Sequence, residues 1–214
     1  MMVSASDLSD MIWCPRIPWF KSIGVKTSAS HNTRKGMYFH KTIEDLFNQI
    51  RSMLSLHIPG RIIGTEIYLP QNIRSEETLG LVGRVDVLRQ APEGFIVQEL
   101  KSCDPPPGGW IYETHRVQLN AYAYLAEMDG FSPVIYGIVI YRDLMPREIE
   151  PDIDSIPDLI RRYYKLRDSF VMPEGRYENC RCCPYRPLCS ILPRKARITK
   201  EQLLSLRELD LATK

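Results

Sequence analysis

Hydrophobic side chains between Arg34 and Leu54 recur every three or four residues, which is the spacing of one face of a helix. The pattern predicts an amphipathic helix that ends before Pro59-Gly60, because these two residues cannot continue it. His40 lies three residues before Ile43 on the same stripe, so its side chain is expected to point inward. A histidine in that place is either a metal ligand or a core residue whose hydrogen bonds are satisfied.

Three strand-like runs follow this helix, at Ile62 to Leu69, Leu79 to Leu88 and Phe95 to Ser102. The last two are separated by Ala91-Pro92-Glu93-Gly94, where proline suits the second position of a type I turn and glycine the fourth. These two runs therefore predict an antiparallel hairpin with a four-residue loop.

The remainder of the chain alternates between loops, helices and strands. Asp104 to Gly109 holds three prolines and two glycines, so this segment is expected to be a loop. We expect a helix over residues 113 to 128, a strand over Val134 to Tyr141, a helix over about 155 to 170 and a short helix over Glu201 to Leu209.

The predicted hairpin brings charged side chains together. With a four-residue loop, the numbers of facing residues sum to 185, so Asp86 stands opposite Glu99 with Cβ atoms about 4.5 to 5.5 Å apart. Lys101 is two residues beyond Glu99 and emerges on the same face. The opposite face is expected to be a core surface, made by Leu81, Val85, Val87, Ile96 and Leu100.

Two facing carboxylates repel each other unless a cation lies between them, and a hard divalent ion such as Mg²⁺ or Mn²⁺ suits that place. Such an ion activates a water molecule and polarises a phosphoryl oxygen, while a nearby lysine orients the water or neutralises charge on a phosphate. Gly83 leaves room beside Asp86 for a bulky ligand or another backbone to approach. Asp86, Glu99 and Lys101 therefore suit phosphodiester hydrolysis, or else they form a salt-bridge ladder on an exposed hairpin.

Composition and charge add limits to this picture. The 214 residues fit one large domain, or one domain with a small appendage. The net charge is +2, but residues 161–200 carry +8 and the rest −6, which suits contact with a phosphate backbone or an ordinary solvated surface. Asp7 and Asp10 lie where a signal peptide needs basic residues, and no apolar run approaches the roughly 20 residues of a membrane span. We expect a cytoplasmic protein.

The cysteines are clustered as metal ligands are. Cys14 is near the start of the chain, and Cys180-Arg181-Cys182-Cys183 with Cys189 lies near the end. Four thiolates hold a zinc ion or an iron–sulfur cluster, and here they would tie the two ends of the chain together. Zinc modules usually bring two C-x2-C pairs, so a single distant cysteine favours iron–sulfur, although the spacing does not rank Cys182 against Cys183. Cys103 is expected to be a small residue in the core or at a strand end.

Six motifs occur in sequence order: Cys14-Pro15-Arg16, Gly36-x3-His40-x3-Glu44, Gly83-x2-Asp86, Glu99-x-Lys101, Gln118-x3-Tyr122 and Cys180-x2-Cys183-x5-Cys189. In this order they resemble the CRISPR-associated Cas-four family of RecB-like nucleases, over nearly the whole chain. The resemblance implies an α/β core of the restriction-endonuclease-like, PD-(D/E)xK type, with a mixed central sheet flanked by helices. It also implies a nuclease domain over residues 31–174 and an iron–sulfur region over residues 1–30 and 175–214.

The resemblance implies roles for residues of the nuclease site. The metal ligands would be the side chains of His40, Asp86 and Glu99 and the backbone carbonyl of Leu100, and Lys101 would be catalytic. Gln118 and Tyr122 lie four residues apart on one helical face and would contact DNA or support the metal site, unless they merely border an amphipathic helix. Glu44, one turn beyond His40, would support that histidine.

The resemblance also selects the cluster ligands, which would be Cys14, Cys180, Cys183 and Cys189. It favours a [4Fe-4S] cluster, although four thiolates also hold [2Fe-2S]. The cluster would be structural, because it closes the nuclease core between the two ends of the chain.

The implied activity is metal-dependent cleavage of single-stranded DNA from an end, with endonuclease cleavage as a further activity. In the cell it would trim DNA before new spacers enter a CRISPR array in antiviral defence, with the Cas-one and Cas-two integrase proteins as partners. One alternative is an iron–sulfur exonuclease of DNA repair, of the exonuclease V or helicase-associated type. Another is a DNA-binding module that is clasped by a metal and has no catalytic activity.

Overall fold

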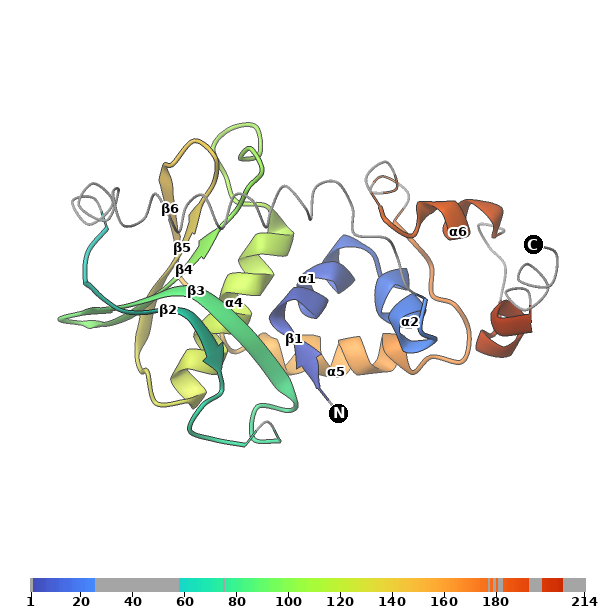
Figure 1. The fold of residues 1–214 in the computed structure, drawn as a ribbon, viewed down its shortest axis with the longest axis horizontal. Coiled ribbons are helices and arrows are strands. Elements are labelled where there is room, and N and C mark those ends of the chain that lie inside the picture. The colour runs from blue at the N-terminus through green and yellow to red at the C-terminus, as the bar shows by residue number, and fades with distance from the viewer. Residues whose placement is uncertain are drawn as a thin grey trace.

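The computed structural model describes residues 2–25, 58–74, 76–176, 178, 180, 183–192 and 198–205 (Figure 1). Its elements in chain order are β1 (Val3–Ser4), α1 (Ala5–Trp13), α2 (Arg16–Ser22), β2 (Arg61–Leu69), β3 (Leu81–Ala91), β4 (Gly94–Leu100), α4 (Glu113–Met128), β5 (Val134–Ile140), β6 (Pro146–Ile149), α5 (Ile156–Arg167) and α6 (Arg186–Ile191). Residues 200–205 are also helical and overlap the terminal helix that was predicted from Glu201. The helix predicted over residues 34–54, with His40 and Glu44, lies outside the described residues.

Six strands of the described chain form one mixed sheet, in the order β1-β3-β4-β5-β6, with β2 also paired to β3. The pairs β1–β3 and β4–β5 are parallel, whereas β2–β3, β3–β4 and β5–β6 are antiparallel. This sheet with its helices confirms the predicted α/β class.

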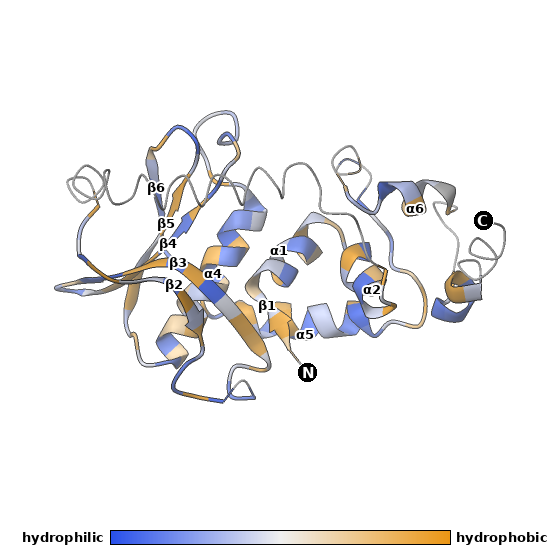
Figure 2. Ribbon diagram, viewed as in Figure 1, coloured by the Kyte–Doolittle hydropathy of each residue, from blue (hydrophilic) through white to orange (hydrophobic). Residues whose placement is uncertain are grey.

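The helices form layers on one face of the sheet. Helix α4 lies against β3, β4 and β5, α1 packs on α4, and α5 runs beside α1 and α2 (Figure 1). Hydrophobic residues run along the strands and through α2, whereas α5 is largely hydrophilic in this view (Figure 2). The buried residues of α5 are Ile156, Ile160 and Tyr163, whose spacing of four and three residues places them on one face. None of the helices in the described part of the chain is long and apolar enough to cross a bilayer.

Three apolar clusters hold these layers together. The largest lies between the sheet and helices α4, α1 and α5. The second joins the two ends of the chain and contains Cys14, Ile17, Trp19, Phe20, Met172, Tyr185, Leu192 and Leu203. The third is made by Ile58, Ala91, Ile96, Leu100, Ile138 and Ile140. The division into a nuclease domain and a terminal region stays a prediction.

The hairpin between β3 and β4 has the predicted register. Its pairs run from Val87 opposite Gln98 to Ala91 opposite Gly94, and all of them follow the predicted sum. The predicted loop length was wrong, because Ala91 and Gly94 are themselves paired and only Pro92 and Glu93 form the turn. Removing one residue from each side of a loop leaves the register unchanged.

The predicted single core face of this hairpin was also wrong. Leu81 and Val85 belong to the cluster with α4, whereas Ile96 and Leu100 belong to the third cluster. The β3–β4 pairs begin only at Val87, so the alternation of the hairpin cannot be extended back to residues 81–85. This sheet is moreover buried by apolar residues in two clusters, so hydrophobicity alone does not separate its faces.

At Gly83, β3 lies close against side chains of α4. A Cβ atom at this position would lie 2.8 Å from Cε1 of Tyr122 and 3.0 Å from Cδ1 of Leu125. The space predicted beside Asp86 is therefore taken by the ring of Tyr122. Gly83 is needed for this approach and not for an unusual backbone, because its φ lies outside the left-handed region.

We predict that Gly83→Ala lowers the free energy of unfolding by about 1–3 kcal/mol, because the added methyl group overlaps the ring of Tyr122. Urea unfolding followed by circular dichroism measures the change. In a double-mutant cycle, Tyr122→Leu should remove part of the steric overlap. The double variant should then lose less unfolding free energy than the two single variants lose together. Strictly additive effects would show that Gly83 and Tyr122 do not compete for space.

Candidate active site and cysteine pocket

Asp86 and Glu99 lie where the β3–β4 ladder ends. The last backbone pair is Val87 opposite Gln98, so these two acids are the next residues along each strand. The backbone N–H of Leu100 donates to Oδ2 of Asp86 over 2.7 Å, so a carboxylate replaces a backbone acceptor and ties β4 to β3. Both acids are buried, with 7% and 3% of their surface exposed.

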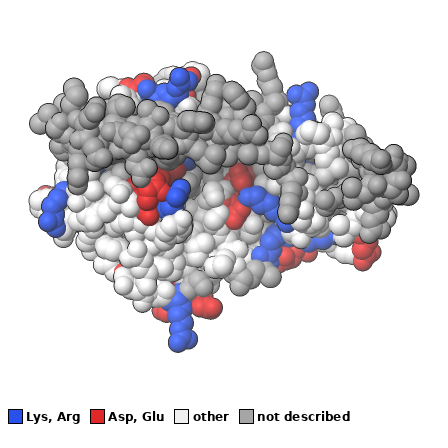
Figure 3. Space-filling view, in the orientation of Figure 1, with Lys and Arg blue, Asp and Glu red and all other residues white. Residues whose placement is uncertain are grey.

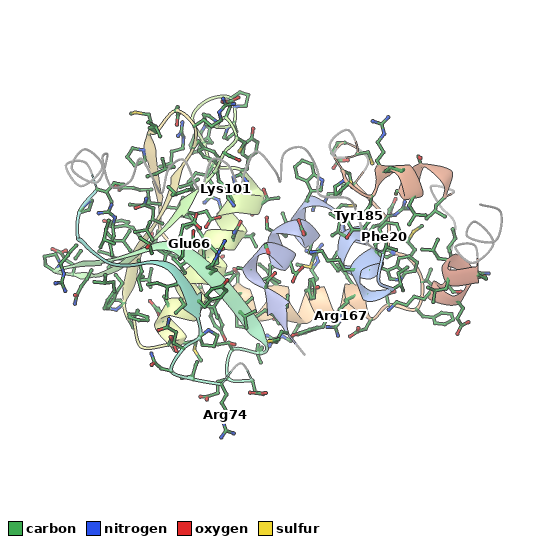
Figure 4. All side chains as sticks on the ribbon, viewed as in Figure 1. Phe20, Glu66, Arg74, Lys101, Arg167 and Tyr185 are labelled. Atoms are coloured by element: carbon green, nitrogen blue, oxygen red, sulfur yellow. The ribbon has the colours of Figure 1, made fainter. Side chains whose placement is uncertain are left out.

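Lys101 follows the last residue of β4 and joins this pair to α4 (Figure 4). Its Nζ donates to Oε1 of Glu99 over 2.6 Å and to Oε1 of Gln118 over 2.7 Å. Nε2 of Gln118 donates to the same oxygen of Glu99 over 2.9 Å and to the hydroxyl oxygen of Tyr122 over 2.7 Å. Four residues predicted for the site, Glu99, Lys101, Gln118 and Tyr122, therefore form one connected hydrogen-bond network.

Burial controls the charges in this network. Burial, and then the negative charge of Glu99, raise the pKa of Asp86 far above its ordinary value, although the Leu100 N–H and Lys101 oppose the change. Burial also raises the pKa of Tyr122, so its phenol stays neutral and serves as a hydrogen-bonding group. Without a further cation, the site favours a protonated Asp86 at neutral pH.

The two carboxylates fit a divalent cation. Oε2 of Glu99 is buried and has no hydrogen-bond partner, which is costly unless a cation or water occupies the space beside it. Among the described residues, no three His, Cys, Asp or Glu side chains are arranged to hold an ion, so Asp86 and Glu99 need another ligand. His40 lies outside the described residues, and its role and that of the Leu100 carbonyl stay predictions.

Two neighbours of the site were not identified from the sequence. Glu66 on β2 lies between the pairs Thr65–Val87 and Ile67–Val85, and its charge adds to the rise in the pKa of Asp86. His115 lies on α4 one turn before Gln118, and burial followed by the charge of Lys101 lowers its pKa to about 3. The three-residue spacing of His115 and Gln118 could have indicated a shared helical face.

The four predicted cluster cysteines line one pocket. Cys14, Cys180, Cys183 and Cys189 surround a space of about 370 Å³ that includes solvent at its mouth. Its wall includes the rings of Phe20 and Tyr185, which stack with centroids 5.2 Å apart (Figure 4). The chain thus brings Cys14 to the other three, at a distance from the Lys101 network in this view.

Without a bound metal, this pocket disfavours the thiolate form of its cysteines. Burial raises the pKa of Cys180 and of Cys183, and the neighbouring cysteines raise both further. A bound metal favours the thiolate and offsets this effect. Arg16 is 2% exposed, and its Nη1 donates to Sγ of Cys189 over 2.9 Å. No three of the described cysteines have the arrangement of a metal site, so the iron–sulfur cluster and its ligands stay a prediction.

The two remaining cysteines are Cys103 and Cys182. Cys103 follows the end of β4, as one of its two predicted places has it, and it is exposed, so the alternative place in the core was wrong. Cys182 lies outside the described residues, so the choice between Cys182 and Cys183 stays open.

In the described part of residues 161–200, some of the basic side chains are paired with acidic ones. Arg161 pairs with Asp158, and Arg167 pairs with Asp168 and stacks on the ring of Tyr164. On the face shown in Figure 3, the coloured basic and acidic atoms lie intermingled in small groups. Charge alone therefore does not identify a path for DNA here.

The PD-(D/E)XK nuclease superfamily profile matches residues 39–190. The chain belongs to this superfamily. Its name describes an acidic residue, any residue and a lysine, and Glu99-Leu100-Lys101 has that form at the end of β4. Membership makes the protein a nuclease that uses a divalent metal and acts on DNA.

The crystal structure of SSO0001 is similar to this superfamily member. The TM-score is 0.57 at 20% sequence identity, over 92% of this chain and 88% of the other. At this identity the similarity shows a shared fold. No curated protein sequence matches the chain.

We predict that Asp86 makes the metal-free protein less stable as pH rises. The pKa of Asp86 is higher in the folded protein than in the unfolded chain, so its contribution is present at low pH and is lost between about pH 4 and the raised folded value. Asp86→Asn removes this titration and should gain stability relative to the wild type, by up to about 1.4 kcal/mol per pH unit.

Urea unfolding of both proteins at pH 5, 6, 7 and 8 without divalent metal measures this difference. Asp158→Asn on α5, where the carboxylate is largely exposed, serves as the control for removing one negative charge. Added Mg²⁺ should reduce the difference, because a cation favours the charged carboxylate. A stability gap that does not change with pH would contradict the raised pKa.

Proposed function

We propose that the chain is an Mg²⁺- or Mn²⁺-dependent DNA nuclease that cleaves single-stranded DNA from an end, with internal cleavage as a further activity. The observation that carries the proposal is the network of Lys101, Glu99 and Gln118 beside the buried Asp86. The membership of the chain in the PD-(D/E)XK superfamily supports it.

Asp86 and Glu99 would hold the metal, with His40 and the Leu100 carbonyl as the further proposed ligands. When bound, a divalent ion supplies a Lewis acid for the phosphoryl oxygen and lowers the pKa of a water molecule. Asp86 gives up its proton when the ion binds, because its raised pKa results from burial and from the charge of Glu99. Oε2 of Glu99 is the carboxylate oxygen free for this task.

Lys101 would act on the substrate. Its ammonium group is held by Glu99 and Gln118, and its side chain remains 18% exposed, so one donor can reach a phosphate oxygen or the attacking water. Gln118 in turn donates to Glu99 and to Tyr122, which orients its amide oxygen toward the lysine. Lys101 is thereby positioned before the substrate arrives, which lowers the cost of ordering it in the transition state.

The proposed cellular role is the trimming of DNA before spacers enter a CRISPR array, with the Cas-one and Cas-two integrase proteins as partners. Six motifs in the order of the Cas-four family support this role. The pocket lined by Cys14, Cys180, Cys183 and Cys189 supports a structural iron–sulfur cluster, with [4Fe-4S] favoured over [2Fe-2S].

We predict that Asp86→Asn, Glu99→Gln and Lys101→Met each reduce cleavage about a hundredfold or more, because the first two weaken metal binding and the third removes the cation beside the phosphate or the attacking water. Mg²⁺-dependent digestion of single strands labelled at the 5′ or 3′ end measures the rate and the polarity together. Circular single strands separate internal cleavage from cleavage at an end.

Glu148→Gln, at an exposed position of β6, is the matched control and should retain wild-type activity. Undiminished cleavage by all three site variants would show that the activity has another source. To test the partners, purified Cas-one and Cas-two are supplied with DNA that has long single-stranded ends. Integration of trimmed ends that requires Lys101 supports the CRISPR role, whereas digestion unaffected by these proteins favours a repair exonuclease.

We predict that Cys189→Ala loses bound iron, visible absorption and thermal stability together, because it removes one cluster ligand and the partner of Arg16. Iron analysis and absorption spectra of anaerobically purified protein measure the loss. Cys103→Ala is the control and should keep its iron, since Cys103 is exposed beyond β4. Parallel Cys182→Ala and Cys183→Ala proteins identify the ligand between these two, and full iron content in Cys189→Ala would remove Cys189 from the set.

A further inference from the structure

We propose that Trp110 is a stacking platform for a nucleobase of a single-stranded substrate, and that Arg142 contacts the adjoining phosphate. The inference rests on the proposed nuclease function and adds the way in which the substrate strand is held beside the site.

The proposed platform is built by two loops that follow the C-terminal ends of two neighbouring strands. Strands β4 and β5 are parallel and in register up to Leu100 and Ile140, and Lys101 continues the pairing by donating its N–H to the Ile140 carbonyl. The loop over residues 101–112 and the turn over residues 141–145 therefore start side by side, next to the catalytic lysine. Figure 1 shows both at the upper end of the sheet.

Large apolar side chains are exposed on these two loops. Trp110 is 73% exposed, and Met145 on the other loop is 61% exposed. Tyr112 and Leu144 are also partly exposed. Trp110 packs against the backbone at Gly108, where an added Cβ would lie 3.2 Å from Cδ1 of the indole, and most of the ring remains accessible. A tryptophan with this much free surface suggests a binding role.

The two loops are held together by Arg147. Its Nε donates to the Gly109 carbonyl over 2.8 Å, and its Nη1 donates to the Met145 carbonyl over 3.0 Å. Its Nη2 also pairs with Asp143 over 2.6 Å. Because one guanidinium group bonds both loops, the segments that carry Trp110 and Met145 are joined before any ligand binds, which reduces the entropy lost on binding.

Arg142 supplies a cation that can exchange its partner. Its Nη1 lies 3.8 Å from Asp104, and the two side chains are 58% and 80% exposed. An exposed pair at this distance contributes little stability, so a phosphate can replace Asp104 as the partner. Arg147 cannot serve in this way, because its side chain is only 14% exposed and its donors are engaged.

A single-stranded nucleic acid is the occupant that these features fit. It offers an unpaired base for the exposed indole of Trp110 and a phosphate for Arg142, and these two residues lie on the two loops that Arg147 joins. The loop that carries Trp110 also begins at Lys101, so the platform and the proposed active site share one segment of the chain. A second copy of the chain or another protein would need only the apolar surface and would make no use of these two arrangements.

The test compares Trp110→Ala and Trp110→Phe with the wild type. Binding of an oligothymidylate is measured without divalent metal, so that no cleavage occurs, and the matched oligonucleotide with abasic sites serves as the second ligand. We expect Trp110→Ala to bind the oligothymidylate about tenfold more weakly and to raise KM with little change in kcat, while Trp110→Phe keeps most of the affinity. The abasic ligand should bind the wild type and Trp110→Ala equally.

Fluorescence and salt dependence separate the two contacts. Oligothymidylate should quench the emission of the wild type, and Trp110→Phe should lose this quenching although Trp13 and Trp19 remain. Arg142→Gln should lower the slope of log affinity against log salt by about one and weaken both ligands alike. Phe170→Ala, at a residue that is 60% exposed in the segment after α5, is the control and should behave as the wild type.

The outcomes distinguish this inference from the function on which it rests. A wild-type protein without nuclease activity contradicts the proposed function. An active wild type whose Trp110→Ala variant binds and cleaves normally overturns the platform. Sedimentation adds a third result, since a change of oligomeric state in Trp110→Ala with unchanged DNA binding would make this surface a protein interface and would also overturn it.

Discussion

Two carboxylates that face each other in a buried place are unfavourable, and the arrangement around Asp86 and Glu99 follows from this constraint. Each acid receives a different compensation. Asp86 accepts the backbone N–H of Leu100 and has a raised pKa, whereas Glu99 accepts from Lys101 and Gln118 through one oxygen and leaves the other without a partner. Protein groups thus offset only part of the repulsion, and the divalent cation proposed for this site would offset the rest. Binding of that ion to the folded protein would then stabilise the fold.

The hairpin that carries this pair was predictable because its register depends on local information. Pro92 and Gly94 mark the turn, and the sum of facing positions is the same for a two-residue and a four-residue loop. The helix over residues 113–128 was likewise predicted with its observed bounds, because its apolar residues recur over four turns. Helices α1 and α2 are shorter and were not predicted. At α1 the sequence holds two signals, the three-residue spacing of the buried Ala5, Leu8 and Met11 and a capping box in which Ser4 and Asp7 accept each other's backbone N–H.

The contacts within the site could not be predicted from such local patterns. Spacing places Gln118 and Tyr122 on one face of α4, but only the packing of α4 on the sheet brings Gln118 to Lys101. The effect of Glu66 on the pKa of Asp86 depends on the pairing of β2 with β3, because this pairing brings together two residues that are far apart in the sequence. Gly83 illustrates the same limit. The sequence indicates that something approaches this residue closely, and the structure identifies it as Tyr122.

The bonds between the two ends of the chain span a long stretch of sequence. The indole N–H of Trp19 donates to the Ser169 carbonyl, 150 residues away, and Arg16 reaches Cys189 across 173 residues. During synthesis, α2 therefore leaves the ribosome before the residues that pack against it. Its apolar side chains are exposed on the nascent chain until those residues follow. Tyr185, Leu192 and Leu203 complete the second apolar cluster, so a chain that ends before them lacks part of it. Loss of the residues that follow α5 would therefore expose the apolar side chains of α2, which favours aggregation.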